Sequence, residues 1–202
     1  APPAPPCLVD IRRTASRALT TRGIRQMGPR FSPDGEWVAY SSGSLRRFPQ
    51  IRLVRKDGTE DRRLAERNGG ATLSWTPDGR AIVFDEMEVH RTFYRTFDLR
   101  RVDVATGRVL RLTRGLRARE PDVSPDGRTV VFVRKMGDRS ELFTIALDGS
   151  GQVYVVDATA KRVVVFDAVW QHLPEGTPRV TSAERRAAIA LRQRHLQRRE
   201  VV

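Results

Sequence analysis

The stretch Phe31-Ser32-Pro33-Asp34-Gly35 leads directly into the apolar run Trp37 to Tyr40. The same corner recurs as Trp75-Thr76-Pro77-Asp78-Gly79 and again as Val123-Ser124-Pro125-Asp126-Gly127, each time before another apolar run. The three prolines are 44 and 48 residues apart (77 minus 33, 125 minus 77). This spacing indicates a repeat architecture, in which each unit buries its apolar surface against its neighbours.

Each corner has a physical reason to be a tight turn. Proline presets φ for the second position of a type I turn, and the Ser or Thr before it can bond the turn backbone. Aspartate side chains bond nearby amides, and glycine takes a positive φ at little cost. We therefore interpret the Ser or Thr, Pro, Asp and Gly residues of the three corners as a structural turn motif. Asp34, Asp78 and Asp126 are corner formers rather than catalysts, since an active site seldom needs three copies of itself.

The run that follows each corner is apolar without strict alternation: Trp37 to Tyr40, Ala81 to Phe84, and Val130 to Val133. A strand that is buried on both faces has this pattern. The middle strands of a β-propeller blade are sandwiched in this way, and a period of about 40–50 residues is typical of such blades. The aromatic side chains expected in the core are Trp37, Trp75, Phe84 and Phe132.

The sequence therefore predicts an all-β fold of about three whole four-stranded blades plus partial ones. Propellers typically close with about 4–8 blades, so we expect an incomplete ring. Three alternatives stay open: the chain is a fragment, it pairs with a second copy to complete the ring, or it caps itself with its C-terminal helix.

The chain divides into three predicted parts. Residues 1–7 are Pro-rich and expected to be disordered, residues 8–166 form the propeller segment, and residues 167–202 form a loop and a basic helix or tail. Thr181-Ser182-Ala183-Glu184 is a capping box, which opens a helix that is predicted to run to about Arg199.

Three segments depart from the simple repeat. Leu8 to Arg12 and Arg17 to Thr20 resemble the outer half of a blade. Residues 87–96 are predicted to be a long excursion inside the second blade. Val153 to Asp157 and Arg162 to Phe166 form a predicted hairpin, which is either the outer strand of the third blade plus one more strand or the outer hairpin of another blade.

Composition limits the classes of function. The chain has 202 residues and a formal net charge of +13, a balance that can favour nucleic acid or anionic membranes. The arginines are scattered through strands, turns and tail, so we do not expect nucleic-acid binding. No apolar run approaches the roughly 18 residues of a membrane span, and no signal peptide is recognisable. Cys7 is the only cysteine and is expected to be a free thiol.

A search for catalytic patterns gives little. The sequence contains no Gly-x-Ser-x-Gly nucleophile elbow and no phosphate-binding Gly-x-x-x-x-Gly-Lys. Glu86, Glu88 and His90 would share one face of an extended strand, where carboxylates and an imidazole can bind a divalent metal. The alternative is that these side chains are solvated and paired with Arg91 and Arg95. We favour this alternative and predict no catalytic, cofactor or metal residues. His172 and His195 are isolated and receive no role.

The segments "FSPDGEWVAYSS", "SWTPDGRAIVFDE" and "PDVSPDGRTVVFV" resemble the TolB-like, WD40-like β-propeller family, and the resemblance covers roughly residues 8–150. The resemblance implies a non-enzymatic, extracytoplasmic scaffold that has no cofactor and binds a protein partner, often in the periplasm. Related propellers also form the front domain of prolyl-oligopeptidase-like serine peptidases. The alternative function is therefore the gating propeller of such a peptidase, whose catalytic domain is absent from these residues.

Overall fold

The computed structural model describes residues 7–10, 15–20, 25–43, 49–70, 72–89, 95–136 and 139–155. Every helix or strand element in that part of the chain is a β-strand, so the all-β prediction is confirmed. The Pro-rich residues 1–6, the strand predicted at 162–166 and the helix predicted after Thr181 lie outside the described residues.

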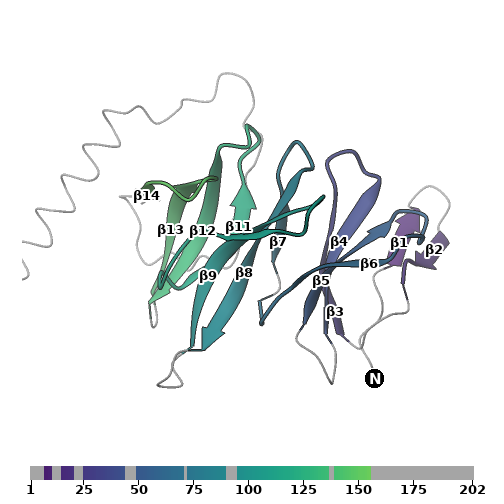
Figure 1. Cartoon of the computed structure of the whole chain (residues 1–202), viewed down its shortest axis with the longest axis horizontal. Helices are drawn as coiled ribbons and strands as arrows, with labels where there is room; N and C mark the ends of the chain where they lie inside the picture. The colour runs from purple at the N-terminus through teal and green to yellow at the C-terminus, as the bar shows by residue number, and fades with distance from the viewer. Residues whose placement is uncertain are drawn as a thin grey trace, which may run out of the picture.

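The described strands form three four-stranded antiparallel sheets and one two-stranded pair (Figure 1). The pair consists of β1 (Cys7–Asp10) and β2 (Ala15–Ala18). The first sheet consists of β3 (Arg25–Phe31), β4 (Trp37–Gly43), β5 (Gln50–Arg55) and β6 (Arg62–Glu66). The second consists of β7 (Leu73–Trp75), β8 (Ala81–Val89), β9 (Arg95–Asp103) and β10 (Val109–Arg111). The third consists of β11 (Ala118–Val123), β12 (Thr129–Met136), β13 (Arg139–Ala146) and β14 (Gln152–Val155).

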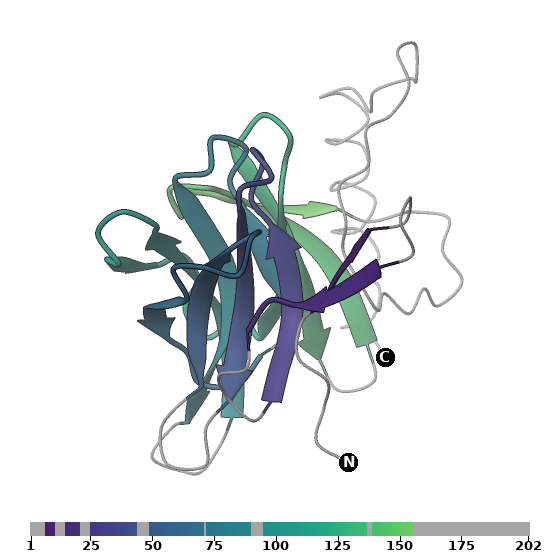
Figure 2. The ribbon, with the colours of Figure 1, turned by 90° about the vertical axis from the view of Figure 1, so that its right-hand side faces the viewer.

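The sheets follow one another in chain order like the blades of a propeller. In Figure 1 they run from the purple β1–β2 pair at the right to the green third sheet at the left, and Figure 2 views the molecule from the β1–β2 end. The first strands of successive sheets, β3, β7 and β11, are neighbours. These three are therefore the inner strands of the blades, and the predicted set of three whole four-stranded blades is confirmed.

The core lies between the sheets. In β8, Ile82 and Phe84 belong to the apolar cluster shared with the first sheet, whereas Val83 belongs to the cluster shared with the third. All three side chains are fully buried. Successive strand residues point to opposite faces, so a strand covered on both faces carries no polar alternation.

The long excursion predicted at residues 87–96 is wrong. Strand β8 continues to Val89 and β9 begins at Arg95, with Met87 opposite Phe97 and Glu88 opposite Thr96. Only residues 90–94 connect the two strands. The charged side chains of this segment resemble those of a loop, so the sequence does not indicate the strand extension. Arginines of the same sheet pair with the two glutamates, which allows the strand to continue.

The pairing of the last described strand decides whether the segment from Val153 belongs to the third sheet or to another blade. Strand β14 pairs antiparallel with β13, with Thr144 opposite Val153. It is therefore the fourth strand of the third sheet rather than part of another blade.

The three corners share one hydrogen-bond pattern. In the third corner the Ser124 hydroxyl donates to Oδ1 of Asp126 and accepts the N–H of Thr129 at 2.9 Å. The N–H of Gly127 donates to the carbonyl of Ser124 at 2.8 Å. In the second corner the hydroxyl of Thr76 makes the same two contacts, with Asp78 at 2.6 Å and Ala81 at 2.9 Å.

The corners also lie against one another from blade to blade. A Cβ atom placed on Gly79 would lie 3.9 Å from Cδ of Pro33, in the preceding corner. A Cβ atom placed on Gly127 would lie 3.4 Å from Cδ of Pro77. Each corner glycine thus packs beside the proline of the corner before it.

We predict that replacing Ser124 by Ala lowers the free energy of unfolding by about 1–3 kcal/mol, because the N–H of Thr129 loses its acceptor in a partly buried place. The matched control is Ser124→Thr, which the second corner already uses and which should stay within about 0.5 kcal/mol of the wild type. Urea unfolding followed by tryptophan fluorescence measures both. Equal stability of the alanine and threonine variants would contradict this role of the hydroxyl.

Candidate functional site

The antiparallel order of each sheet gives the stack two rims. The three corners and the turns between third and fourth strands lie at one end of the strands, which we call the corner rim. The connections between second and third strands, and those between successive sheets, lie at the opposite end, the loop rim. All twelve residues of the predicted turn motif lie at the corner rim. Glu86 and Glu88 lie toward the loop rim, and His90 lies outside the described residues.

The corner carboxylates serve the turns that contain them. The Ser32 hydroxyl and the N–H of Glu36 lower the pKa of Asp34 from its ordinary value. The pKa of Asp78 and that of Asp126 are lowered in the same way, first by the hydroxyl of Thr76 or Ser124. All three carboxylates are charged hydrogen-bond acceptors near neutral pH, which is unfavourable for a general acid.

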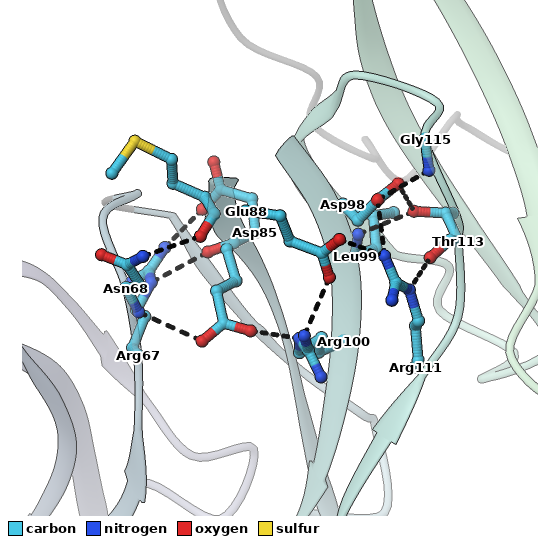
Figure 3. A network of polar contacts seen from close by, with 12 residues as sticks. Arg67, Asn68, Asp85, Glu88, Asp98, Leu99, Arg100, Arg111, Thr113 and Gly115 are labelled. Carbon is cyan, nitrogen blue, oxygen red and sulfur yellow. Dashed lines mark hydrogen bonds and ion pairs between the residues drawn. The ribbon is translucent and has the colours of Figure 1, made fainter. Parts of the chain in front are cut away.

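A buried arginine joins the first two sheets at the loop rim. Arg67, directly after β6, donates from Nε to the carbonyl of Asp85 at 3.0 Å and pairs with the Asp85 carboxylate (Figure 3). It also donates to the hydroxyl of Ser41 and, at 3.0 Å, to the carbonyl of Thr72. Burial lowers the pKa of Arg67, and the Asp85 carboxylate opposes that shift.

The chain approaches this ion pair very closely. Gly70 has a φ of 75°, in the left-handed region. A Cβ atom placed there would lie 2.5 Å from the carbonyl oxygen of Asp85 and 2.6 Å from Nη2 of Arg67. Only glycine fits this position without a shift of the backbone. The Asn68-Gly69-Gly70 break in the sequence therefore serves the docking of the second sheet on the first.

A second group of charges lies on β8, β9 and β10. Arg100 pairs with Glu86 and donates from Nη2 to Oε1 of Glu88 at 2.9 Å. Arg111 pairs with Glu88 and lies 3.1 Å from Oδ2 of Asp98 (Figure 3). Glu86 and Glu88, which were weighed as metal ligands and interpreted instead as paired with arginine, are therefore each held by an arginine.

Asp98 fixes the connection from the second sheet to the third. Its Oδ2 accepts the N–H of Gly115 at 2.7 Å, and its Oδ1 accepts the hydroxyl of Thr113 at 2.8 Å and the N–H of Leu116 at 3.1 Å. Burial raises the pKa of Asp98, but these donors and Arg111 outweigh it, so the pKa lies below its ordinary value.

Sequence reasoning found Glu86 and Glu88 but missed Arg67, Asp98 and the arginines that hold the glutamates. The pairing register of β8 and β9 could have revealed the partner of Glu86. Glu86 lies opposite Asp98, and Arg100 lies two residues further along β9. Side chains two apart on one strand share a face, so Glu86 and Arg100 are diagonal neighbours. That signal becomes visible only once β8 and β9 are known to pair along their full length.

This arrangement holds the charged side chains of the second sheet in place. Within the residues that the structure describes, no three His, Cys, Asp or Glu side chains gather in a group that could hold a metal ion. The same part of the chain contains no helix with the length and apolar character that a membrane crossing requires. What the loop rim does offer is exposed arginine, at Arg95 and Arg114.

The fold defines the class of protein: a β-propeller array of four-stranded blades with Ser/Thr-Pro-Asp-Gly corners. The family described as the TolB beta propeller domain matches residues 7–172. The chain belongs to this family, which confirms the resemblance drawn from its corners.

Known proteins show how far this likeness reaches. An uncharacterised protein of Agrobacterium fabrum is 27% identical over 128 residues, which are 63% of this chain and 42% of that protein. The crystal structure of TolB from Acinetobacter baumannii matches 73% of this chain and 36% of its own, with a TM-score of 0.61 and 19% identity. An oligogalacturonate lyase from Vibrio parahaemolyticus matches 73% of this chain and 45% of its own, with a TM-score of 0.59 and 19% identity. The chain thus spans less than half the length of each of these three proteins, and the structural matches establish the fold alone.

Asp98 should give the chain a recognisable pH dependence. Because its pKa is depressed in the folded chain, its contribution to stability is present above the ordinary aspartate pKa of about 3.9 and is lost as the pH falls through the folded value. In Asp98→Asn, the amide NH₂ faces two hydrogen-bond donors in either orientation. We predict that this variant loses about 1–3 kcal/mol at pH 7.

The difference in unfolding free energy between wild type and Asp98→Asn should shrink as the pH falls below about 4. Urea unfolding at a series of pH values measures it. The matched control is Asp148→Asn in the β13–β14 turn, where the carboxylate accepts the N–H of Ser150 and an asparagine oxygen can replace it. A difference for Asp98→Asn that stays constant from neutral to acidic pH would exclude the charged network as its cause.

Proposed function

We propose that this chain is a non-enzymatic propeller scaffold that binds another protein outside the cytoplasm through its loop rim. Membership of the TolB beta propeller domain family supports the scaffold role. Fold alone does not decide activity, and the fold is shared with a lyase, so the argument depends on the rim itself.

One observation carries the proposal: three carboxylates of the second sheet that lie toward the loop rim are engaged by donors of the same chain. Glu86 and Glu88 are paired with Arg100 and Arg111, and Asp98 accepts four hydrogen bonds. A general acid or base must be free to exchange a proton with a substrate, and a metal ligand must offer a lone pair. These carboxylates are instead engaged by arginine and backbone donors of the same chain, which favours a structural role for them at the rim.

A rigid rim with exposed arginines suits the recognition of a protein surface. Arg95 begins β9 and Arg114 lies between β10 and β11, both exposed at the loop rim. Arginine is enriched at protein interfaces, because its planar group makes several directed hydrogen bonds. Side chains on loops of a rigid scaffold are a common place for binding. We therefore expect the partner to present acidic side chains to this rim.

Affinity capture with matched charge reversals tests the proposal. The full chain is immobilised as wild type, as Arg95→Glu/Arg114→Glu at the loop rim, and as Arg80→Glu/Arg108→Glu at the corner rim, where both arginines are also exposed. A periplasmic extract of the source organism is passed over each. We predict that a protein retained by the wild type is also retained by the corner-rim variant and is lost from the loop-rim variant.

Two results would contradict the proposal. One is retention that is unchanged in the loop-rim variant, since the partner would then bind elsewhere. The other is turnover of a substrate by the purified chain that survives the corner-rim substitutions and is abolished by the loop-rim substitutions, since the rim would then be a catalytic site.

A further inference from the structure

Arg119, the second residue of β11, lies at the loop-rim end of that strand. Its guanidinium covers the ring of Phe97 in β9, with Cζ 3.9 Å from the ring centroid. Its Nε atom is buried, and among the described residues it has neither a hydrogen-bond acceptor nor a carboxylate partner. Arg100 and Arg111 of the second sheet, by contrast, each pair with a glutamate. The positive charge of Arg119 is therefore available to a negative group from another molecule.

The fold does not require an arginine at this place. Strands β3 and β11 share a bulge at which the pairing register shifts. In the first sheet the shift falls between Met27 and Arg30, and in the third it falls between Arg119 and Asp122. Met27 thus holds the place of Arg119 in the first sheet, so a positive charge is not needed to form the bulge. Bulges are frequent beside functional sites, where they re-aim a side chain.

The loop-rim ends of β8 and β9 place an exposed apolar side chain near Arg119. Val89, the last residue of β8, is 56% exposed and lies opposite Arg95, which is also exposed. Phe97 lies two residues further along β9, so it shares one face of the hairpin with Val89 and Arg95. Diagonal neighbours on paired strands are about 7–8 Å apart. One ligand can therefore reach both Val89 and the guanidinium that covers Phe97.

Three acidic side chains near this surface are engaged elsewhere. Glu86 and Glu88 point to the opposite face of the hairpin, because successive strand residues alternate, and arginines hold them there. Glu120 follows Arg119 in the sequence, but its carboxylate lies 3.8 Å from the ammonium group of Lys135. The surface around Arg119 is therefore positive, and its charge favours an anionic ligand.

We propose that Arg119, Phe97 and Val89 form a recognition site for an extended acidic segment of a partner protein. A carboxylate of that segment accepts two hydrogen bonds from the guanidinium of Arg119, a pairing that arginine geometry favours. An apolar side chain two residues away points the same way and packs on Val89, since such residues are about 6.5–7 Å apart in an extended chain. This inference rests on the proposed function, because it names what the partner presents to the loop rim.

A peptide fits this surface better than a nucleic acid does. Proteins bind single-stranded nucleic acid by stacking its bases on aromatic rings. Phe97 is half-buried, and Arg119 already covers one face of its ring. Val89 offers an aliphatic contact rather than a stacking surface. A carboxylate next to an apolar side chain uses both the charge and this aliphatic contact.

NMR titration of the full, isotope-labelled chain with a defined peptide tests the site. The probe is the capped peptide Ser-Gly-Ser-Leu-Ser-Asp-Ser-Gly-Ser, in which the leucine and the aspartate are two residues apart. We predict saturable shifts of the backbone amide signals of Val89 and Phe97, with a dissociation constant of about 1 mM. Arg119→Met, which introduces the residue of the first bulge, should weaken binding about tenfold or more. The matched control Arg55→Met removes an arginine that covers another aromatic ring, at the corner rim, and should bind like the wild type.

Altered probes separate the two contacts. A probe with asparagine in place of aspartate should bind the wild type and Arg119→Met equally weakly. A probe with serine in place of leucine should lose affinity for the wild type but not for Val89→Ser. The proposal is overturned by no saturable shift up to about 10 mM probe, or by equal binding of the original probe to Arg119→Met and the wild type. Tighter, Arg119-dependent binding of oligothymidylate would also overturn it, as would a urea midpoint of Arg119→Met well below that of the wild type, since the guanidinium would then serve the fold.

This inference and the proposed function can fail separately in the capture experiment. A partner that Arg119→Met retains like the wild type, but that Arg95→Glu/Arg114→Glu loses, would leave the proposed function standing and overturn this inference. A partner that Arg95→Glu/Arg114→Glu retains unchanged, together with probe binding that depends on Arg119, would support the site and overturn the proposed function.

Discussion

The middle sheet has to be covered on both faces, and the rest of the structure follows from that constraint. Strand β8 points Phe84 toward the first sheet and Val83 toward the third, and neither retains exposed surface. Full burial of side chains of this size is worth about 1.5–3 kcal/mol each, which an isolated sheet would forgo. The corners and the loop-rim ion pairs hold neighbouring sheets at the spacing at which these side chains fit.

Buried polar groups show how tightly the spacing is set. The Arg67–Asp85 pair is costly to remove from water. It is tolerated because the backbone carbonyls of Thr72 and Asp85 and the hydroxyl of Ser41 also accept hydrogen bonds from the guanidinium. Gly70 lets the backbone approach that pair more closely than any side chain would allow. Asp98 stabilises the connection between the second and third sheets, because its carboxylate accepts the N–H of Gly115 in the turn there.

The fold could be predicted from the sequence because its decisive signals are local. A Ser/Thr-Pro-Asp-Gly corner and a two-faced apolar strand each fit within about ten residues, and their repetition identifies the blade. The ion pairs could not be predicted in the same way. Arg67 and Asp85 are 18 residues apart (85 minus 67) and belong to segments of different sheets. The partner of Glu86 depends on a register that its polar neighbours conceal, since Glu88 and Arg95 resemble loop residues in sequence.

Amide hydrogen exchange of the native chain tests the central claim most directly. If coverage on both faces holds the stack together, the amides of β8 and β9 should be the slowest to exchange, because they open only when both interfaces are lost. The amides of β1 and β2, which within the described part of the chain are covered by the first sheet alone, should exchange fastest among the described strands. Exchange in β8 as fast as in β1 would contradict the account, since the middle sheet would then gain nothing from its two neighbours.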